Sequence, residues 1–385
     1  MLRFLDAGES HGKAIVVILE GLPFGIPVDA GGINNELSRR RIGYGRSARM
    51  NIEVDEVKIT SGIRAGVTIG SPLALEVANA EYDKWQKVMN IEKPANEDAL
   101  THLRPGHADL AGAIKYGTGD VRNILERASA RETVGRVSAG AVAKNFLNIF
   151  DIEIYSHVRS VDGVQAKIDT ESLGIELLRE ADQDPVRCLD AGASQQMIKE
   201  IDKAREEGDS LGGVFEVVAF GVPIGLGSHV HWDRRLDGRI AAGIMSMQAI
   251  KSVEIGDGFM LSRMRGSEAA DRIYHEKGKG FRHSSNHAGG IEGGMTNGEP
   301  VVVRAAMKPI PTLASPLDSV DLSSKKRIKA TVERSDVCAV PAAAVIAESA
   351  LAFILADALI EKLGGDNIDE MKERYQKLKR FQADF

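Results

Sequence analysis

The sequence contains few cysteine and aromatic residues, and both shortages restrict the classes of protein it can encode. Cys188 and Cys338 are the only cysteines among 385 residues, and they lie far apart. We therefore expect neither a disulfide framework nor a cysteine-based metal site. Phe, Trp and Tyr make up 5% of the residues, so the core must consist mainly of Val, Ile, Leu and Ala.

Long apolar segments are missing as well. A membrane-spanning helix needs about 18 or more apolar residues, and the nearest approach, Val337–Ile360, contains Glu348 and Asp357. The N-terminal residues lack the apolar segment of a secretory signal. Lys and Arg number 49 against 55 Asp and Glu, a net charge of −6, which disfavours nucleic acid or an anionic membrane as a partner. We expect a cytoplasmic protein.

Several common catalytic motifs are also absent. No G-x-G-x-x-G follows a predicted strand, which argues against a dinucleotide-binding Rossmann domain. Neither H-E-x-x-H nor paired C-x-x-C occurs, so no metal site is indicated. The G-x-S-x-G turn of the α/β-hydrolases is missing too. Any catalysis must therefore depend on other groups.

Hydrophobic periodicity predicts a mixture of strands and helices. Apolar, largely β-branched runs predict strands at Lys13–Glu20, Val57–Thr60, Leu73–Val77, Ile152–Val158 and Val214–Val222. Helical spacing predicts helices after Asp29, at Asp120–Phe150, Gly238–Ile250 and Val340–Leu363, and in the charged tail Asp366–Phe385. Gly135 and Gly140 would each cost a helix about 1 kcal/mol relative to alanine, so we expect close packing there. The glycine-rich stretch Gly256–Gly294 is expected to be a loop.

One pattern occurs twice. Six residues at the same offsets in Gly62–Pro72 (Gly-Ile-x-x-Gly-x-Thr-x-Gly-x-Pro) recur in Gly290–Pro300, and an apolar run follows each copy. The alternative explanation is coincidence in a chain with 40 glycines. We interpret the repeat as an internal duplication, which predicts one pseudo-symmetric domain instead of several independent ones.

Five arginines fall within the eleven residues Arg39–Arg49, where Gly43 and Gly45 interrupt them. Such crowding is unfavourable unless anions neutralise it, and the planar guanidinium suits carboxylate and phosphate. The alternative is a solvated basic face that pairs with the protein's own acidic residues. We favour a site for a small polyanion, because a plain helix face has no need of the Gly-x-Gly turn.

Four further segments carry candidate functional residues, each with a plainer alternative. His11 lies in the turn Gly8–Gly12 and His107 in Arg104–Asp109, where each histidine could be a surface or capping residue. Arg127 and Arg131 are one helical turn apart, which a surface salt-bridge ladder also explains, and Asp336 can simply cap a helix. The residues favour an anion-binding enzyme with histidine acids. A non-catalytic binder of phosphorylated metabolites or RNA, or a metal-dependent phosphotransferase, is the alternative.

Together these segments resemble the chorismate synthase family. The matching motifs are GESHG at Gly8–Gly12, GLP at Gly21–Pro23, RPGHAD at Arg104–Asp109, and the segments Arg40–Arg49, Glu126–Lys144, Lys308–Thr312 and Arg334–Ser349. The resemblance implies an α+β fold, a β-α-β sandwich, with one catalytic domain over residues 1–365 and a helical tail over 366–385. It also implies a homotetramer and a lyase that converts 5-enolpyruvylshikimate 3-phosphate to chorismate by 1,4-anti elimination of phosphate with reduced FMN.

The resemblance also implies roles for individual residues. His11 would protonate or stabilise the reduced flavin, His107 would give a proton to the departing phosphate, and Asp336 would help relay the proton that the flavin takes from the ring. Contacts with substrate or NADP are implied for Arg40, Arg46, Arg49, Arg104 and Arg131. Contacts with FMN are implied for Arg127, Ala128, Ser129, Gln248, Ala249, Gly293, Lys308, Pro309, Ile310, Pro311, Thr312 and Arg334. The family often has serine where this chain has Ala128, so only backbone contacts are expected there. NADPH and an outside reductant both stay open as sources of electrons.

Overall fold

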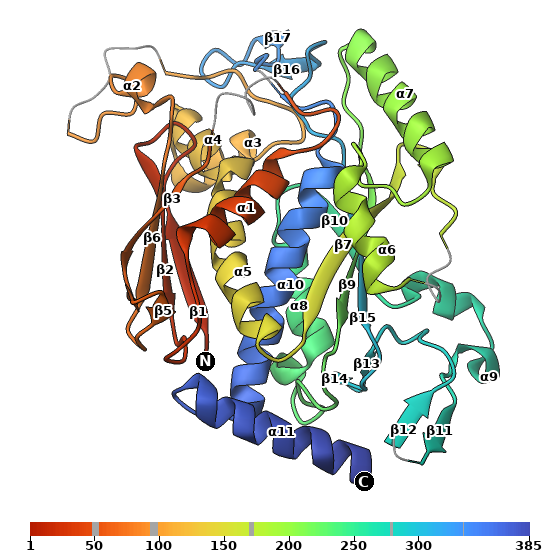
Figure 1. Cartoon of the computed structure of the whole chain (residues 1–385). Coiled ribbons are helices and arrows are strands. Elements are labelled where there is room, and N and C mark those ends of the chain that lie inside the picture. The colour runs from red at the N-terminus through yellow and green to blue at the C-terminus, as the bar shows by residue number, and fades with distance from the viewer. Residues whose placement is uncertain (48–53, 93–98, 169–172, 278–279, 334) are drawn as a thin grey trace.

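Two antiparallel sheets enclose a layer of helices in the computed structural model of the chain (Figure 1). The structure describes residues 1–47, 54–92, 99–168, 173–277, 280–333 and 335–385.

The first sheet has the order β1 (Arg3–Ala7), β2 (Ala14–Glu20), β6 (Leu73–Ala78), β3 (Val57–Ser61). The second has the order β10 (Ile250–Ile255), β15 (Val301–Met307), β9 (Gly213–Phe220), β7 (Glu153–Val161), β8 (Val164–Gln165). The middle layer contains α1 (Ala30–Arg41), α5 (Thr133–Asn148), α8 (Leu236–Met245) and α10 (Val340–Leu363). The predicted α+β class and β-α-β sandwich are confirmed.

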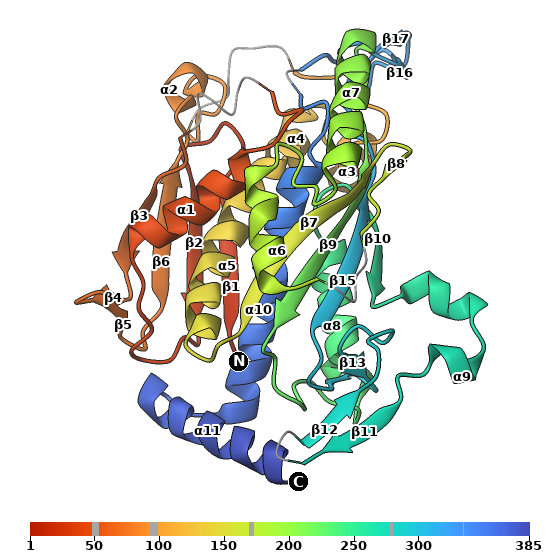
Figure 2. The ribbon, with the colours of Figure 1, turned by 45° about the vertical axis from the view of Figure 1, so that its right-hand side comes forward.

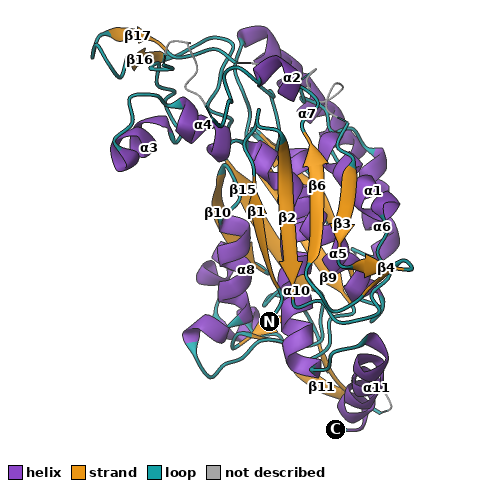
Figure 3. Cartoon of the chain, turned by 90° about the vertical axis from the view of Figure 1, so that its left-hand side faces the viewer, coloured by secondary structure: helices purple, strands orange, loops and turns teal. Residues whose placement is uncertain are grey.

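The first sheet shows how sequence alternation creates this layering. Successive residues of a strand point to opposite faces. In β2, Ile15, Val17 and Leu19 are fully buried against the helices, whereas Val16 and Ile18 are exposed. Figure 3 shows the outer face of this sheet, which is not covered by any helix in the described part of the chain.

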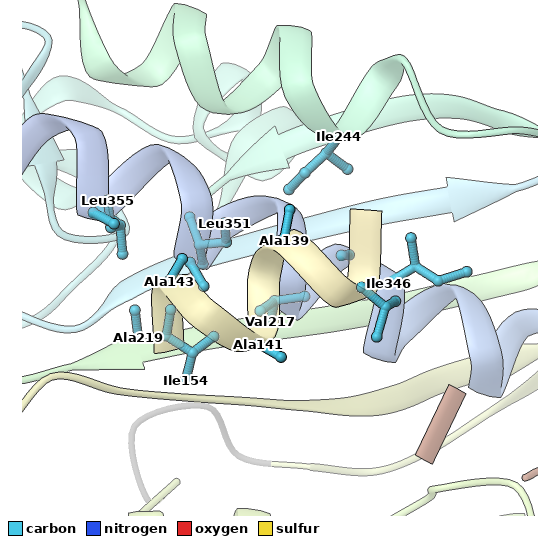
Figure 4. Close-up of a cluster of buried hydrophobic side chains, with 14 of the residues drawn as sticks. Ala139, Ala141, Ala143, Ile154, Val217, Ala219, Ile244, Ile346, Leu351 and Leu355 are labelled. Atoms are coloured by element: carbon cyan, nitrogen blue, oxygen red, sulfur yellow. The ribbon is translucent and has the colours of Figure 1, made fainter. Parts of the chain in front are cut away.

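Helices α5 and α10 lie side by side between the two sheets (Figure 1 and Figure 4). Both are surrounded by apolar neighbours from the two sheets, so they are apolar on nearly every side, as expected for helices buried in a core. Small residues such as Ala139 and Ala143 allow the helices to approach closely. A Cβ built on Gly140 would lie 2.2 Å from Ser349 Cβ, which confirms the close packing predicted at this glycine.

Replacement of Gly140 by alanine is expected to destabilise the fold by about 1–3 kcal/mol, the usual cost of overpacking a core. The added methyl group would also lie 2.5 Å from Ser349 Cα, so the backbone of α10 would have to move. Gly32→Ala in α1 is the matched control, because its new Cβ would meet no atom nearer than 3.8 Å. Thermal unfolding of both variants measures the effect. Equal melting temperatures would show that the helix contact tolerates the methyl group.

Helix α10 also has the length and apolar character of a membrane-spanning segment. Its mean hydropathy is 2.0 over an 18-residue window, but 72% of that window is buried inside the protein. Pro341 lies in its first turn and Gly364 follows its last residue, as the sequence predicted. The core position accounts for the hydropathy.

The two halves of the molecule repeat the same arrangement. The duplicated motif forms the hairpin β4–β5 (Ile63–Arg64, Val67–Thr68) before β6, and the hairpin β13–β14 (Ile291–Glu292, Met295–Thr296) before β15. In each copy the threonine Oγ1 donates to a proline carbonyl and accepts a backbone N–H. The partners are Pro23 O and Ile26 N for Thr68, and Pro223 O and Leu226 N for Thr296. The strand order β1-β2-β6-β3 corresponds to β7-β9-β15-β10. The internal duplication is therefore visible in topology and hydrogen bonding.

Three sequence-based expectations were wrong in detail. The helix expected over Asp120–Phe150 is divided into α4 (Arg122–Ala128), a 3-10 turn (Ala130–Glu132) and α5, because Ser129 is extended and caps the turn through Arg131 N–H. The helix expected over Gly238–Ile250 is α8, Leu236–Met245, and Ile250 begins β10. The loop expected over Gly256–Gly294 contains regular elements instead. These are a 3-10 helix (Gly258–Arg263), α9 (Gly266–Ala269) and the strands β11 (Ile273–Glu276), β12 (Gly280–His283) and β13.

The remaining elements lie around the sandwich (Figure 2). They are α2 (Tyr82–Trp85), α3 (Asp109–Tyr116), α6 (Ile175–Glu180), α7 (Ala191–Glu207), β16 (Asp318–Val320), β17 (Arg327–Lys329) and α11 (Ile368–Asp384). Helix α11 contributes Met371 and Tyr375 to the main core. Cys188 and Cys338 are free and buried. Burial raises the pKa of each thiol to about 11.

Candidate functional site

A cavity of about 380 Å³ lies at the end of the sandwich where α5 and α10 begin. Thr133, the first residue of α5, and Ala339, the N-cap of α10, both line it. The first backbone N–H groups of a helix lack partners inside the helix and carry partial positive charge, which favours anions. Two helix N-termini meet at this cavity, so the backbone favours an anion there even without the charged side chains.

The cavity collects most of the residues proposed from the sequence. Those that line it are His11, Arg40, Arg46, Arg104, His107, Ala128, Ser129, Arg131, Gln248, Ala249, Lys308, Ile310, Pro311, Thr312 and Asp336. They come from segments spread over more than three hundred positions of the chain. The sandwich brings them together because the segments that carry them lie at the same end of the central helices.

Other predicted site residues lie elsewhere. Arg127 does not line the cavity, because its guanidinium donates to Gly8 O and to Asp6. Pro309 and Gly293 do not line it either, and Gly293 lies in the turn between β13 and β14. Arg49 and Arg334 fall outside the residues that the structure describes.

Arg40 and Arg131 form a buried cationic wall of the cavity, with 4% and 5% of their surface exposed. Both guanidinium groups bind the carboxylate of Asp55. Arg40 Nε donates to Thr133 Oγ1 at 2.9 Å, and Arg131 Nε donates to Asn79 Oδ1 at 2.8 Å. These contacts hold two like charges near each other against their repulsion. The wall therefore presents positive charge in a fixed geometry to an anionic ligand.

Asp109 orders the second cationic group of the cavity. It is fully buried, and its Oδ1 accepts from His107 Nδ1 at 2.6 Å and from Arg104 Nη2 at 2.9 Å. Burial disfavours the carboxylate, but the hydrogen bonds from Arg104 and His107 outweigh it and hold the pKa of Asp109 well below its usual range. Arg104 Nη2 also lies 3.0 Å from His107 Nδ1, but the shorter contact of Nδ1 is with Asp109, and a carboxylate oxygen only accepts, so His107 carries a hydrogen on Nδ1. Its Nε2, 3.3 Å from Arg104 Nη2, is the ring nitrogen left for a ligand.

Asp336 is held at the edge of the cavity by the arginine-rich segment. Arg46 Nη1 donates to Asp336 Oδ2 at 2.7 Å, and the Ser47 backbone N–H donates to Oδ1 at 2.7 Å. Arg39, in contrast, points away from the cavity and pairs with Glu36, Asp182 and Glu348. The arginine cluster is thus divided between a ligand site and a structural network.

One wall of the cavity suits a flat ring with polar edges. Ala128, Met247, Ala343 and Ile346 supply apolar surface. Gln248 Nε2 donates to Glu132 at 2.9 Å, whereas its buried Oε1 has no hydrogen-bond partner among the described residues. A buried acceptor without a partner is unfavourable, and a ligand N–H in the cavity would satisfy it. Lys308 Nζ donates to Gly106 O at 2.6 Å, which links its loop to the turn that carries His107.

Several residues that act through these side chains were not predicted from the sequence. Asp55 and Asn79 had no motif of their own, and their contacts with Arg131 join positions far apart in the chain. Glu126 and Asp109 lay inside recognised motifs without an assigned role. For Asp109, the spacing of two residues from His107 was an available signal.

Comparison with known proteins gives consistent results over the whole chain. A family model described as chorismate synthase matches residues 2–360. A chorismate synthase of Desulforudis audaxviator is 54% identical over 386 residues, covering 100% of this chain and 99% of that protein. One of Moorella thermoacetica is 54% identical over 375 residues and 97% of both chains. A crystal structure of a chorismate synthase matches with a TM-score of 0.82 and 44% identity, covering 100% of this chain and 99% of that one.

Proposed function

The chain belongs to the chorismate synthase family, and on this premise we propose how its cavity carries out the family's reaction. The reaction converts 5-enolpyruvylshikimate 3-phosphate to chorismate and phosphate and is the last common step of aromatic amino-acid biosynthesis. The chain is therefore a lyase, and its family implies a flavin cofactor.

We propose that the flavin is reduced FMN, seated against Ala128, Gln248 and Ala343. The apolar wall fits a planar ring system, and the unpartnered Oε1 of Gln248 fits an N–H on its edge. Cationic side chains beside this wall, Lys308 among them, fit a single terminal phosphate. When bound, the reduced flavin supplies transient electron density that eases the departure of phosphate from the substrate.

The arginines bind the substrate. It carries two carboxylates and a phosphate, and Arg40, Arg131, Arg104 and Arg46 line one continuous cavity together with two helix N-termini. Asp55 and Asp109 hold the guanidinium groups in place beforehand, so that little side-chain ordering remains to be done when the substrate enters. The convergence of these cations on one cavity is the observation that carries the proposal.

Two residues move protons, and a third supports charge on the cofactor. His107, carrying hydrogen on both ring nitrogens, gives its Nε2 proton to the departing phosphate, and Asp109 accepts from the Nδ1–H throughout. Asp336, fixed by Arg46, helps to relay the proton that the substrate ring loses. His11, carrying hydrogen on both ring nitrogens, supports negative charge on the cofactor with its Nε2–H, because His11 lines the cavity while Glu126 accepts from its Nδ1–H.

The wider assignments follow from the family. We propose a cytoplasmic homotetramer in which residues 1–365 form one catalytic domain and residues 366–385 add a helix. Leu5 and Ile18, with 73% and 45% of their surface exposed on the outer face of the first sheet, are consistent with contact between subunits. NADPH is proposed as a reductant. Turnover with NADPH and FMN that matches turnover with dithionite and FMN would show that the chain uses NADPH directly.

An anaerobic assay tests the proposed function. The protein is mixed with 5-enolpyruvylshikimate 3-phosphate and dithionite-reduced FMN, and phosphate release and chorismate absorbance are followed. We expect release with reduced FMN and none with oxidised FMN. Equal rates with reduced FAD would refute the choice of FMN. No release with any reduced flavin would refute the proposed function.

A further inference from the structure

Glu126 binds the turn that carries His11 through three acceptor atoms, its two carboxylate oxygens and its backbone carbonyl oxygen. Its Oε2 accepts the His11 backbone N–H at 2.8 Å, and its Oε1 accepts from His11 Nδ1 at 3.0 Å. Its backbone carbonyl accepts the Ser10 N–H at 3.0 Å. The Glu126 side chain is 2% exposed and does not line the cavity. Both oxygens of a buried carboxylate thus accept hydrogen bonds from His11.

The face of the same imidazole is covered by a tryptophan. The rings of His11 and Trp85 are stacked, with centroids 4.0 Å apart and planes inclined by 28°. The guanidinium of Arg122 lies 5.5 Å from the Trp85 ring centroid, and its Nη1 lies 3.8 Å from Glu126 Oε1. Trp85 and Arg122 come from α2 and α4, so two separate elements meet around the ring.

We propose that Glu126 and Trp85 are positioning residues that hold His11 with Nε2 available to the cofactor; this inference rests on the proposed function. The carboxylate only accepts, so it requires hydrogen on Nδ1 and leaves Nε2 as the functional nitrogen. Rotation of the ring about χ1 or χ2 would break the contact with Glu126 or the stack on Trp85. The pair therefore keeps a hydrogen on Nδ1 and sets the orientation of a side chain that lies in a turn between two glycines, Gly8 and Gly12.

The first test is a double-mutant cycle in the anaerobic turnover assay. Glu126→Gln is expected to lower turnover by about 10- to 100-fold, the usual effect of removing a partner that orients a functional histidine. In a His11→Ala background the same change should have no further effect, because Glu126 acts through His11. Asn123→Ala, on an exposed position of α4, is the control and should retain full turnover.

An equal loss in both backgrounds would show that Glu126 supports the fold alone and would overturn the proposal. Full turnover in His11→Ala itself would instead refute the proposed role of His11, so the two failures are distinguishable.

The second test reports the geometry of the ring without turnover. Trp85 and Trp232 are the only tryptophans, and Trp232 is 77% exposed, so Trp232→Phe leaves Trp85 as a sole reporter. The stacked imidazole should quench Trp85 emission, and both His11→Ala and Glu126→Gln should raise it. Unchanged emission in Glu126→Gln would show that the ring keeps its place without the carboxylate, against the proposal. Trp85→Leu should lower turnover while Trp85→Phe retains most of it, since phenylalanine preserves the stacking face.

Discussion

Replacement of His107 by alanine is expected to lower turnover by about 10²–10⁴-fold, the usual contribution of a general acid. The structure gives the physical reason. Asp109 accepts from His107 Nδ1 at 2.6 Å, which leaves Nε2 to protonate the departing phosphate. Because the pKa of Asp109 lies well below its usual range, this carboxylate stays ionised near neutral pH and keeps His107 in place. Alanine removes the proton donor without removing the cationic wall of Arg40 and Arg131.

The measurement is steady-state turnover with reduced FMN under anaerobic conditions, together with flavin binding by fluorescence. Flavin affinity should change little, because the apolar wall with Gln248 is untouched. His231→Ala is the control, since the His231 side chain is 60% exposed and pairs with Asp233 on the surface. Turnover like that of the unmodified protein in His107→Ala would exclude His107 as the acid.

Replacement of Glu348 by glutamine is expected to destabilise the fold by about 3–5 kcal/mol, the cost of breaking a buried ion pair from one side. Glu348 lies in α10 with none of its side chain exposed. Its carboxylate accepts from Arg39, Lys144 and Arg187 at 2.6–3.2 Å. Glutamine keeps the shape but removes the charge, so these cations would lose their shared counter-ion. The free energy of unfolding by urea measures the loss.

Glu361→Gln is the matched control on the same helix. Glu361 is 50% exposed and pairs with Arg234 and Arg239 at the surface, where ion pairs contribute about 0–1 kcal/mol. A loss for Glu348→Gln no larger than that of the control would show that the buried network adds nothing to stability.

The same interaction predicts how stability depends on pH. Burial disfavours the Glu348 carboxylate, but the charges of Arg39, Lys144 and Arg187 outweigh it and hold its pKa far below the ordinary 4.5. A carboxyl group whose pKa is lowered in the folded state stabilises that state above the unfolded pKa, and the contribution is lost as pH falls. Stability should therefore decline below about pH 4.5, and Glu348→Gln should make that decline shallower.

The arginine-rich segment shows how far sequence reasoning could go. Five arginines in a short stretch predicted a polyanion site, and the cavity does contain Arg40 and Arg46. The cluster alone did not separate Arg40 from Arg39. Adjacent residues of a helix point about 100° apart, so one faces the cavity and the other faces Glu348. Which arginine faces the cavity depends on which side of α1 is turned toward it, and the local sequence does not contain that information.

The division of the helix expected over Asp120–Phe150 has a similar cause. Apolar periodicity continues through the segment, so the sequence favoured one helix. The extended backbone at Ser129 lets Arg131 reach Asp55 and Asn79, and these partners lie more than fifty positions earlier. Contacts between distant residues outweighed the local preference for a continuous helix.

The sequence by itself determined the elements whose signals are local and the family to which the chain belongs. Alternating apolar residues specified the strands, Pro341 and Gly364 marked the ends of α10, and the repeated Gly-Ile-x-x-Gly-x-Thr-x-Gly-x-Pro pattern revealed the duplication. Only the tertiary structure decided which candidate residues meet at one cavity, how Asp55 and Asp109 hold its arginines, and how Glu126 and Trp85 enclose His11. Each of those contacts depends on the packing of the two sheets around α5 and α10, and packing is a property of the whole chain.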